Sequence, residues 1–370
     1  MEIAWIDGKP ATRDEALRVA GDLFAKARQP FICGLRTDVS GLRAALALAR
    51  QAGAIVDHGA SSSIYGLISA ARDAGAFLAA PAEMRRRADR VLIVGDDAGR
   101  VGADVLKLLA ETKPDLGVET RKSGRRFLAL SRQAVAIDPG SDISHLDCAS
   151  KDVVDVLGMV RAKLAGRRVA EGPVGAGAVE TLAAFLGEAG FAAIVFSPAE
   201  FGEIGTEMIL GLAGDLNDMA RVSTLPVVEW PDAMGAALVA TWTSGFPLRV
   251  SFGRGAAEHD AQLYSTERQL SDEGEADLVV LVDALAGETS AVSGFARPTI
   301  VIADDPAGPS AAKVVFKVAA AGRDHDGVLY EPRFGSFVGV TGKNQSGLPT
   351  AAETLDALAG TLGGTAAEAA

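Results

Sequence analysis

Four histidines have the widest catalytic repertoire in this sequence of 370 residues: His58, His145, His259 and His325. A histidine can bind a metal or move a proton near neutral pH. The metalloprotease pattern needs a second histidine four residues later, with a glutamate beside the first. None of the four has these neighbours. Their wide spacing favours isolated histidines at surface or capping positions, although folding could still bring some of them together.

Two pairs of aspartates directly follow apolar segments. Asp96 and Asp97 come after "RVLIVG", and Asp304 and Asp305 come after "TIVIA". If both segments are parallel strands, these carboxylates lie at the edge of the sheet where open α/β proteins bind ligands. There they would contact a ribose hydroxyl or transfer protons. The competing interpretation is that they cap the helices that follow or face solvent.

Three segments rich in small residues match known loops only in part. "GPVGAG" at 172–177 has Glu180 where a dinucleotide loop needs its third glycine. "GVTGKN" at 339–344 has Asn344 where a P-loop needs a hydroxyl for magnesium. "GASSSIYG" at 59–66 offers three serines but no G-x-S-x-G nucleophile elbow. Residue types and spacing alone therefore show no legible active site.

The elements that would position these residues alternate along the chain. Short runs of Val, Ile and Leu are apolar on consecutive residues, which is typical of strands covered by helices on both faces. Helical patterns lie between them, for example at 13–27 and 39–53. The alternation predicts an α/β fold with doubly wound, mainly parallel sheets. Strands are expected at 30–34, 54–57, 90–95, 127–130, 191–196, 276–282, 299–304 and 313–319.

The length of the chain predicts two domains. "ADRVLIVGDDAG" at 88–99 matches "ADLVVLVDALAG" at 276–287 at several positions, which indicates two similar α/β lobes. Two unrelated buried strands would also look alike. The Gly-rich stretch at 165–180 is predicted to connect the lobes. The last residues, "AGTLGGTAAEAA", are predicted to be a frayed tail.

The composition excludes several classes of partner. A net charge of −12 repels the phosphates of nucleic acids and of anionic lipids. No apolar run reaches the length of about 18 residues that suggests a membrane span, and no signal-peptide pattern opens the sequence. Cys33 and Cys148 are too few for a disulfide framework or an iron–sulfur cluster. These features predict a cytoplasmic protein that binds neither nucleic acid nor membrane.

Several segments, taken together and in order over roughly residues 1–345, resemble the B subunit of formylmethanofuran dehydrogenase, a member of the molybdopterin oxidoreductase superfamily. The most specific is "TWTSGFPLRVSFGRG" at 241–255, which is similar to the family's "W.TGyP.aVdfsRG". "RADRVLIVGDDAG" at 87–99 and "GDLND" at 214–218 also resemble family segments. "GAIVDHGASSSIYG" at 53–66 resembles the stretch that enters the family's catalytic loop.

The departures from the family concern its redox chemistry. Within Ser63–Ile64–Tyr65, the resemblance puts Ile64 at the metal-binding cysteine and Tyr65 at the neighbouring histidine. An alkyl side chain cannot bind molybdenum or tungsten, whereas a thiolate can. The sequence also matches the family only after the cysteine-rich segment that holds its iron–sulfur cluster. We therefore expect no catalytic residue and no metal, and a loop that is only vestigial.

The resemblance also marks a vestigial cofactor site. The Asp96–Asp97 pair stands where the family has a phosphate-contacting Asn–Pro, and carboxylates repel a pyrophosphate. Arg254 is kept, but the tyrosines, the asparagine and the proline around it are not. No pterin cofactor is therefore expected.

The family's architecture implies two α/β lobes like the central domains of molybdopterin oxidoreductases. One lobe is expected to combine residues 1–60 and 166–345, because the family's first lobe is interrupted in sequence. Residues 61–165 are expected to form the other lobe. Residues 346–370 are expected to add a C-terminal helix and the frayed tail.

One branch of the family also lacks redox centres: the B subunit of the formyltransferase/hydrolase complex of methylotrophic bacteria. This branch implies a non-catalytic structural subunit, whose partners are hydrolase, formyltransferase and C-type subunits. Their complex converts formyl-tetrahydromethanopterin to formate through formyl-methylofuran, and methylofuran and metal are expected in the partner subunits. Three alternatives stay open: an active molybdopterin-dependent subunit with redox centres supplied elsewhere, a nucleotide-binding enzyme, and a stand-alone ligand-binding protein.

Overall fold

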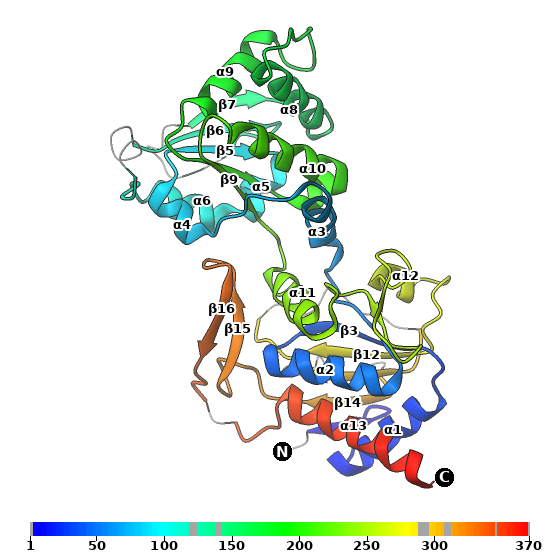
Figure 1. Ribbon diagram of the computed structural model, residues 1–370. Coiled ribbons are helices and arrows are strands. Elements are labelled where there is room, and N and C mark those ends of the chain that lie inside the picture. The colour runs from blue at the N-terminus through cyan, green and yellow to red at the C-terminus, as the bar shows by residue number, and fades with distance from the viewer. Residues whose placement is uncertain are drawn as a thin grey trace. The chain divides into compact units, whose positions relative to one another are not determined.

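The computed structural model divides the chain into two compact units (Figure 1). Unit 1 comprises Met1–Ser61, Trp230–Glu331 and Phe337–Ala370, and unit 2 comprises Ser62–Glu229 and Pro332–Ser336. Neither unit is continuous in sequence. The structure describes residues 3–117, 124–135, 137, 143–287, 296–306, 312–344 and 346–368.

Unit 1 is built on a nine-stranded sheet whose central strands are parallel and whose edge strands are antiparallel. In spatial order the strands are β11 (Glu258–His259), β10 (Val250–Ser251), β4 (Ile55–Val56), β3 (Pro30–Arg36), β12 (Leu278–Asp283), β13 (Thr299–Ala303), β14 (Val314–Lys317), β1 (Ala4–Ile6) and β2 (Lys9–Pro10). The five from β4 to β14 run parallel. A separate hairpin pairs β15 (Gly327–Glu331) with β16 (Ser336–Val340).

Helices cover this sheet on both faces. They are α1 (Arg13–Lys26), α2 (Val39–Ala52), α11 (Pro231–Ser244), α12 (Thr266–Leu270) and α13 (Ala351–Glu368). On one face, α2 and α11 contact β3, and α13 packs on α1 and α2. On the other face, Phe31 and Leu281 belong to an apolar cluster with Tyr264 and Leu270, around α12.

The ends of these helices follow from local chemistry. At the start of α1, the Thr12 hydroxyl and the Glu15 carboxylate each accept a hydrogen bond from the other residue's backbone amide, which forms a capping box. Helix α13 extends further than predicted, through the Gly-rich stretch that was expected to fray. Gln51 of α2 donates a hydrogen bond to the Ala359 carbonyl at 2.9 Å. Tertiary packing of this kind outweighs weak intrinsic helix propensity.

Unit 2 is built on a five-stranded sheet in which every pair is parallel. In spatial order its strands are β7 (Ile143–Asp147), β6 (Arg126–Ser131), β5 (Arg90–Val94), β8 (Ala192–Phe196) and β9 (Val222–Pro226). Figure 1 shows helices on both faces of this sheet. One layer contains α4 (Pro81–Arg87), α5 (Asp96–Val101) and α6 (Ala103–Ala110), and the other contains α3 (Ser62–Ala74), α8 (Ser150–Leu164), α9 (Ala176–Gly187) and α10 (Pro198–Leu216).

The α/β class and the mainly parallel, doubly wound sheets agree with the prediction from alternating strands and helices. The division of the chain differs from the predicted one, because residues 166–229 lie in unit 2. The Gly-rich stretch at 165–180 was expected to join the lobes. Instead it contains the connection between α8 and α9 within unit 2.

Candidate functional site

Each unit has one point where the order of its parallel strands reverses. In unit 2 the chain builds β5, β6 and β7 in one direction and then adds β8 and β9 on the other side of β5. In unit 1 the reversal lies between β3 and β12. Open α/β sheets bind ligands at the carboxyl ends of the strands beside such a reversal. The residues after β5, β8, β3 and β12 are therefore the candidate functional residues.

In unit 2 this position is filled by the chain's own carboxylate. Glu200, in the first turn of α10 after β8, accepts hydrogen bonds from the backbone amides of Asp96 and Asp97, at 3.0 and 2.9 Å. The Ser150 hydroxyl also donates to Glu200. A Cβ atom at Gly95 would lie only 2.3 Å from a Glu200 carboxylate oxygen, so this approach requires glycine. The amides that would receive an anionic ligand at the start of α5 are already hydrogen-bonded.

The side chains of Asp96 and Asp97 bind neighbouring parts of unit 2. Asp96 accepts a hydrogen bond from the Gln133 amide at 2.8 Å, and Asp97 forms an ion pair with Arg100 at 3.0 Å. Both aspartates thus tie α5 to its surroundings. From the sequence, we expected the carboxylates of Asp96 and Asp97 to repel a pyrophosphate. Glu200 was not singled out there. The available signal was Pro198 and then Glu200, shortly after the apolar run 191–196.

Replacing Glu200 with alanine is expected to lower the free energy of unfolding of unit 2 by about 1–2 kcal/mol, because two helix amides lose their charged acceptor. Glu207→Ala alters an exposed carboxylate on the same helix and is expected to change stability by less than about 0.5 kcal/mol. Urea denaturation of both variants, followed by circular dichroism, measures the difference. Equal losses in the two variants would contradict a capping role for Glu200.

In unit 1 the reversal point is closed by a buried ion pair. Arg36 ends β3 and Asp283 ends β12, and Nη1 of Arg36 lies 2.9 Å from Oδ1 of Asp283. Nε of Arg36 lies 3.3 Å from Oδ2 of Asp232, at the start of α11. The Arg36 guanidinium also stands over the Trp230 ring, 5.3 Å from its centroid. This cation therefore already has two carboxylates and an aromatic face as partners.

His58, which follows β4, joins the same cluster. Its side chain is buried, and Nε2 lies 3.1 Å from Oδ2 of Asp232. Nδ1 accepts the Ala60 amide at 3.0 Å, so the proton of the neutral ring resides on Nε2. Burial alone would raise the pKa of Asp232, but the hydrogen bond from His58 and the charge of Arg36 hold that pKa below its ordinary value.

The prediction of an isolated surface or capping histidine was therefore wrong for His58, because folding brings Asp232 beside it from a distant part of the sequence. A histidine–aspartate pair is a common general-base arrangement. Here both ring nitrogens have partners within the chain and the ring is only 1% exposed, so the pair fixes the start of α11.

A second buried cluster lies in the segment that carried the most specific resemblance. Arg254 is 82% exposed and lies 3.6 Å from Glu258. The buried cation of this segment is instead Arg249, whose Nη2 lies 3.1 Å from the Ser61 hydroxyl and whose Nε lies 3.7 Å from Oδ2 of Asp57. Arg249 also has a positive φ of 48°, a conformation that persists only when the surrounding structure enforces it.

Asp57 is the carboxylate at the centre of this cluster. It is fully buried, and Oδ2 accepts hydrogen bonds from the Ser61 hydroxyl and the Thr266 amide, both at 2.8 Å. Burial raises the pKa of Asp57 to about 6, although the charge of Arg249 and the hydrogen bonds oppose this rise. The cluster connects the end of β4, α12 and the segment before β10.

The expected vestigial loop is the first turn of a helix. Ser63, Ile64 and Tyr65 lie in α3, and Ile64 is fully buried. Helix α3 packs closely on α10, and a Cβ atom at Gly66 would lie 2.9 Å from the Gly202 carbonyl carbon. The residues present do not fit a molybdenum or tungsten centre here, because the position has neither a thiolate nor room beside it.

Ile64→Cys is expected to leave the protein without stoichiometric tungsten or molybdenum, because the new thiol would be enclosed between two helices and Glu200 would still occupy the amides of α5. Metal analysis of the purified variant, with the parent protein as control, measures this. One equivalent of bound metal in the variant, and none in the parent protein, would contradict this prediction. It would show that the packing of α3 on α10 leaves room for a metal beside position 64.

Within the residues that the structure describes, no group of three or more His, Cys, Asp or Glu side chains is placed to hold a metal ion. No helix in that part of the chain combines the length and the hydropathy needed to cross a lipid bilayer.

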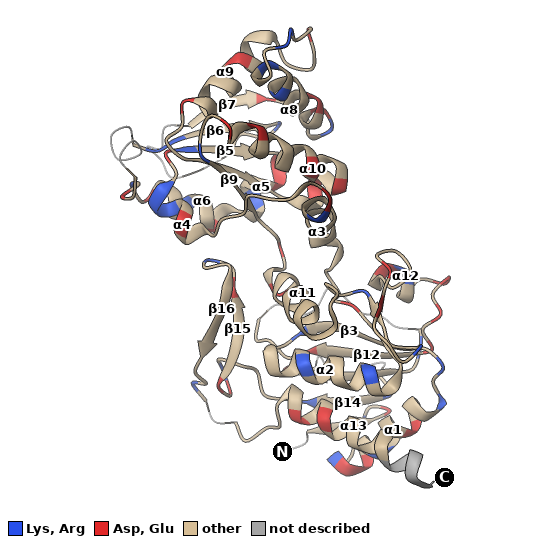
Figure 2. Cartoon of the chain, viewed as in Figure 1, with Lys and Arg blue, Asp and Glu red and all other residues tan. Residues whose placement is uncertain are grey.

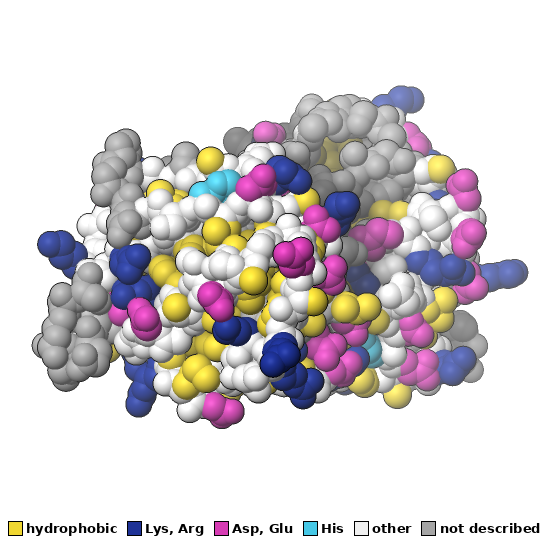
Figure 3. All heavy atoms as spheres, turned by 90° about the horizontal axis from the view of Figure 1, so that it is seen from above, with side chains coloured by type: hydrophobic (Ala, Val, Ile, Leu, Met, Phe, Trp, Pro, Cys, Tyr) yellow, Lys and Arg dark blue, Asp and Glu magenta, His cyan; other side chains and the backbone are white. Residues whose placement is uncertain are grey.

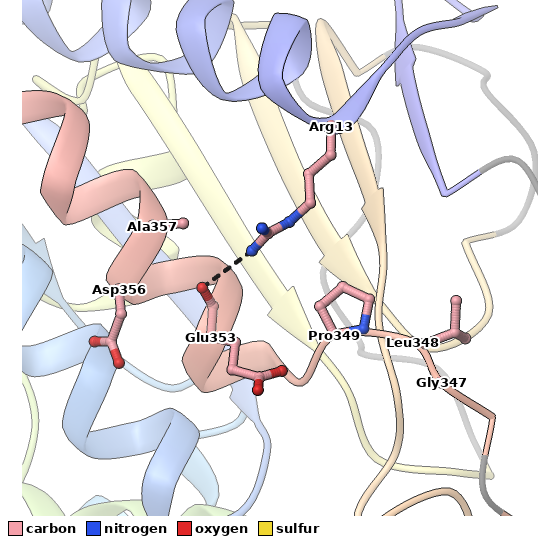
Figure 4. A pocket seen from close by; sticks show the side chains of 7 residues that line it. All are labelled: Arg13, Gly347, Leu348, Pro349, Glu353, Asp356 and Ala357. Carbon is pink, nitrogen blue, oxygen red and sulfur yellow. Dashed lines mark hydrogen bonds between the residues drawn. The ribbon is translucent and has the colours of Figure 1, made fainter.

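An open depression of about 690 Å³ lies in unit 1, away from the residues of both clusters (Figure 4). It is lined by side chains at the starts of α1 and α13. Arg13 donates a hydrogen bond to the Glu353 carbonyl across it, at 3.2 Å, and the carboxylates of Glu353 and Asp356 are exposed. Water therefore reaches its charged groups, unlike those of the two clusters.

No protein-family model matches the sequence. The B subunit of the formyltransferase/hydrolase complex Fhc of Methylorubrum extorquens is 32% identical over 355 residues, which cover 95% of this chain and 94% of that protein. The B subunit of tungsten-containing formylmethanofuran dehydrogenase 2 of Methanocaldococcus jannaschii is 23% identical over 88% of this chain and 77% of its own length.

Among solved structures, a chain of the formyltransferase/hydrolase complex (FhcABCD) from Methylorubrum extorquens in complex with methylofuran matches with a TM-score of 0.88 and 30% identity. The match covers 98% of this chain and 99% of that one. The resemblance predicted from the sequence is thus confirmed over almost the whole chain. This protein belongs to the family of the B subunit of the formyltransferase/hydrolase complex.

Proposed function

We propose that this chain is a non-catalytic structural subunit of a formyltransferase/hydrolase complex, and that it acts by contact with other subunits. The observation that carries the proposal is the Glu200 carboxylate bound to the amides of Asp96 and Asp97. It takes the position of an anionic ligand in unit 2. The Arg36–Asp283 ion pair at the matching position of unit 1 supports the same conclusion.

The proposed partners are formyltransferase, hydrolase and C-type subunits, which together would convert formyl-tetrahydromethanopterin to formate through formyl-methylofuran. Methylofuran and a catalytic metal would be bound by those partners, because neither cluster of this chain offers an accessible set of ligands. Cys33 and Cys148 are buried free thiols, which fits a reducing cytoplasm. Holding the active sites together would keep the local concentration of the transferred intermediate high.

The test is deletion of this chain from the cell that makes the complex. Formyltransferase and hydrolase activities are expected to fall together with the amount of assembled complex. Activity per intact partner subunit is the deciding quantity. If the partners stay assembled and still lose turnover, the chain contributes catalytic groups and the structural role is wrong. Formate-dependent dye reduction by the purified chain would also contradict the proposal.

A further inference from the structure

Helix α11 and the hairpin β15–β16 together present a partly exposed apolar surface on unit 1. We call it the α11 face and define it by five side chains: Leu238, Trp242, Val328, Tyr330 and Phe337. Leu238 is 39% exposed, Trp242 is 55% exposed and Val328 is 40% exposed. Three large apolar side chains on neighbouring elements exceed the scattered single residues of an ordinary monomer surface.

These side chains are held in fixed positions. The Trp242 and Phe337 rings meet edge to face with centroids 5.1 Å apart, and Phe337 meets Tyr330 in the same way at 5.7 Å. A Cβ atom at Gly235 would lie 2.6 Å from the Cβ of Tyr330, so this glycine lets the hairpin rest directly on α11. Leu238 lies one helical turn before Trp242 and shares its side of the helix. Binding to such a rigid surface loses little side-chain entropy.

Helix α11 brings almost no charge to the α11 face. The sequence from 233 to 248 contains no Asp, Glu, Lys or Arg, although charged residues make up 23% of the chain. Figure 2 shows the helix α11 almost entirely in tan. By contrast, the face in Figure 3 has acidic and basic side chains scattered among apolar ones. The cores of protein–protein interfaces are depleted of charge and enriched in aromatic residues, and tryptophan often dominates their binding energy.

We propose that the α11 face is the docking surface for another subunit of the hetero-oligomer, one that presents an uncharged, apolar patch. This inference rests on the proposed function. A charged partner surface would lose its hydration against Leu238 and Trp242 without gaining a counter-charge, so complementarity requires a neutral one.

The test uses the full chain, tagged and co-expressed with the other subunits of its complex. Leu238→Lys places a charge on the face, and Trp242→Ala removes its largest side chain. Each is expected to reduce the recovery of formyltransferase and hydrolase subunits, identified by mass spectrometry, by about tenfold. Leu263→Lys is the matched control, because Leu263 is 40% exposed in unit 1 outside the α11 face. It is expected to recover the partners as the parent protein does.

The outcomes separate the two proposals. If the parent chain recovers neither subunit, the proposed function is wrong. If the parent chain recovers them and both face variants do so equally well, the docking surface is wrong and the proposed function stands. Circular dichroism and thermal denaturation of each variant alone exclude a folding defect. Should light scattering show that the variants abolish a homodimer and leave partner recovery unchanged, the occupant is a second copy and the inference fails.

Discussion

Arg249→Met is expected to lower the free energy of unfolding of unit 1 by about 3 kcal/mol at pH 7.5, because it leaves the buried Asp57 without its cation. Methionine keeps most of the side-chain volume, so the loss reports charge and hydrogen bonding rather than a cavity. Arg254→Met, in the same segment, is the control. Arg254 is 82% exposed and is expected to contribute less than about 0.5 kcal/mol. Urea denaturation of both variants gives the two values.

The pH dependence of the Arg249→Met effect provides an independent check. The pKa of Asp57 in the folded protein is about 6, above its ordinary value of 3.8, so protonated Asp57 favours folding below 3.8 and this contribution is lost as the pH rises to 6. Above pH 6 Asp57 is ionised in the parent protein, and Arg249 offsets part of the free energy that burying this charge costs. The difference between parent and variant is therefore expected to shrink as the pH falls through 6. A difference that stays constant from pH 5 to 8 would show that Arg249 acts through its other hydrogen bonds and its packing, and not through the charge of Asp57.

Ile64→Ala is expected to lower the free energy of unfolding of unit 2 by about 3 kcal/mol, because the side chain is fully buried in α3, which packs on α10. Ile204→Ala, on α10, is the control, since Ile204 is 77% exposed. It is expected to change stability by less than about 0.5 kcal/mol.

The comparison of the two isoleucines tests what the Ile64 side chain does in this chain. A large loss for Ile64→Ala shows that Ile64 holds the packing of α3 on α10. A loss as small as that of Ile204→Ala would mean that the position tolerates a cavity, and that the α3 packing described here contributes little to unit 2.

The strands that the sequence predicts are those with helices on both faces. Each of the runs from 30–34 to 313–319 corresponds to a parallel strand, because burial on both sides makes most of the residues apolar. The strands that were missed lie at edges. Strand β7 has only partly buried and exposed residues, and β9 ends in proline. The antiparallel strands at both ends of the nine-stranded sheet are two or three residues long.

The candidate site is less accessible from sequence, because its contacts join residues that are far apart in the chain. Glu200 meets Asp96, and His58 meets Asp232, only after two sheets have formed. The family resemblance drew attention to Arg254, which is exposed, and passed over Arg249 five residues earlier, which is buried. Burial and pairing, which decide a residue's role, are properties of the folded chain.

The interrupted layout of unit 1 has a consequence for synthesis. Strand β3 leaves the ribosome early, but its parallel neighbour β12 follows only after Ser62–Glu229, the main part of unit 2, has been made. Unit 2 can therefore complete its sheet while β3 still lacks one of its two neighbours. During that interval the apolar β3 offers an open edge to any other strand. A chaperone that acts during synthesis is therefore expected to bind the N-terminal segment that contains β3. Slow translation between β4 and β12 would lengthen the exposure of this edge and so promote aggregation.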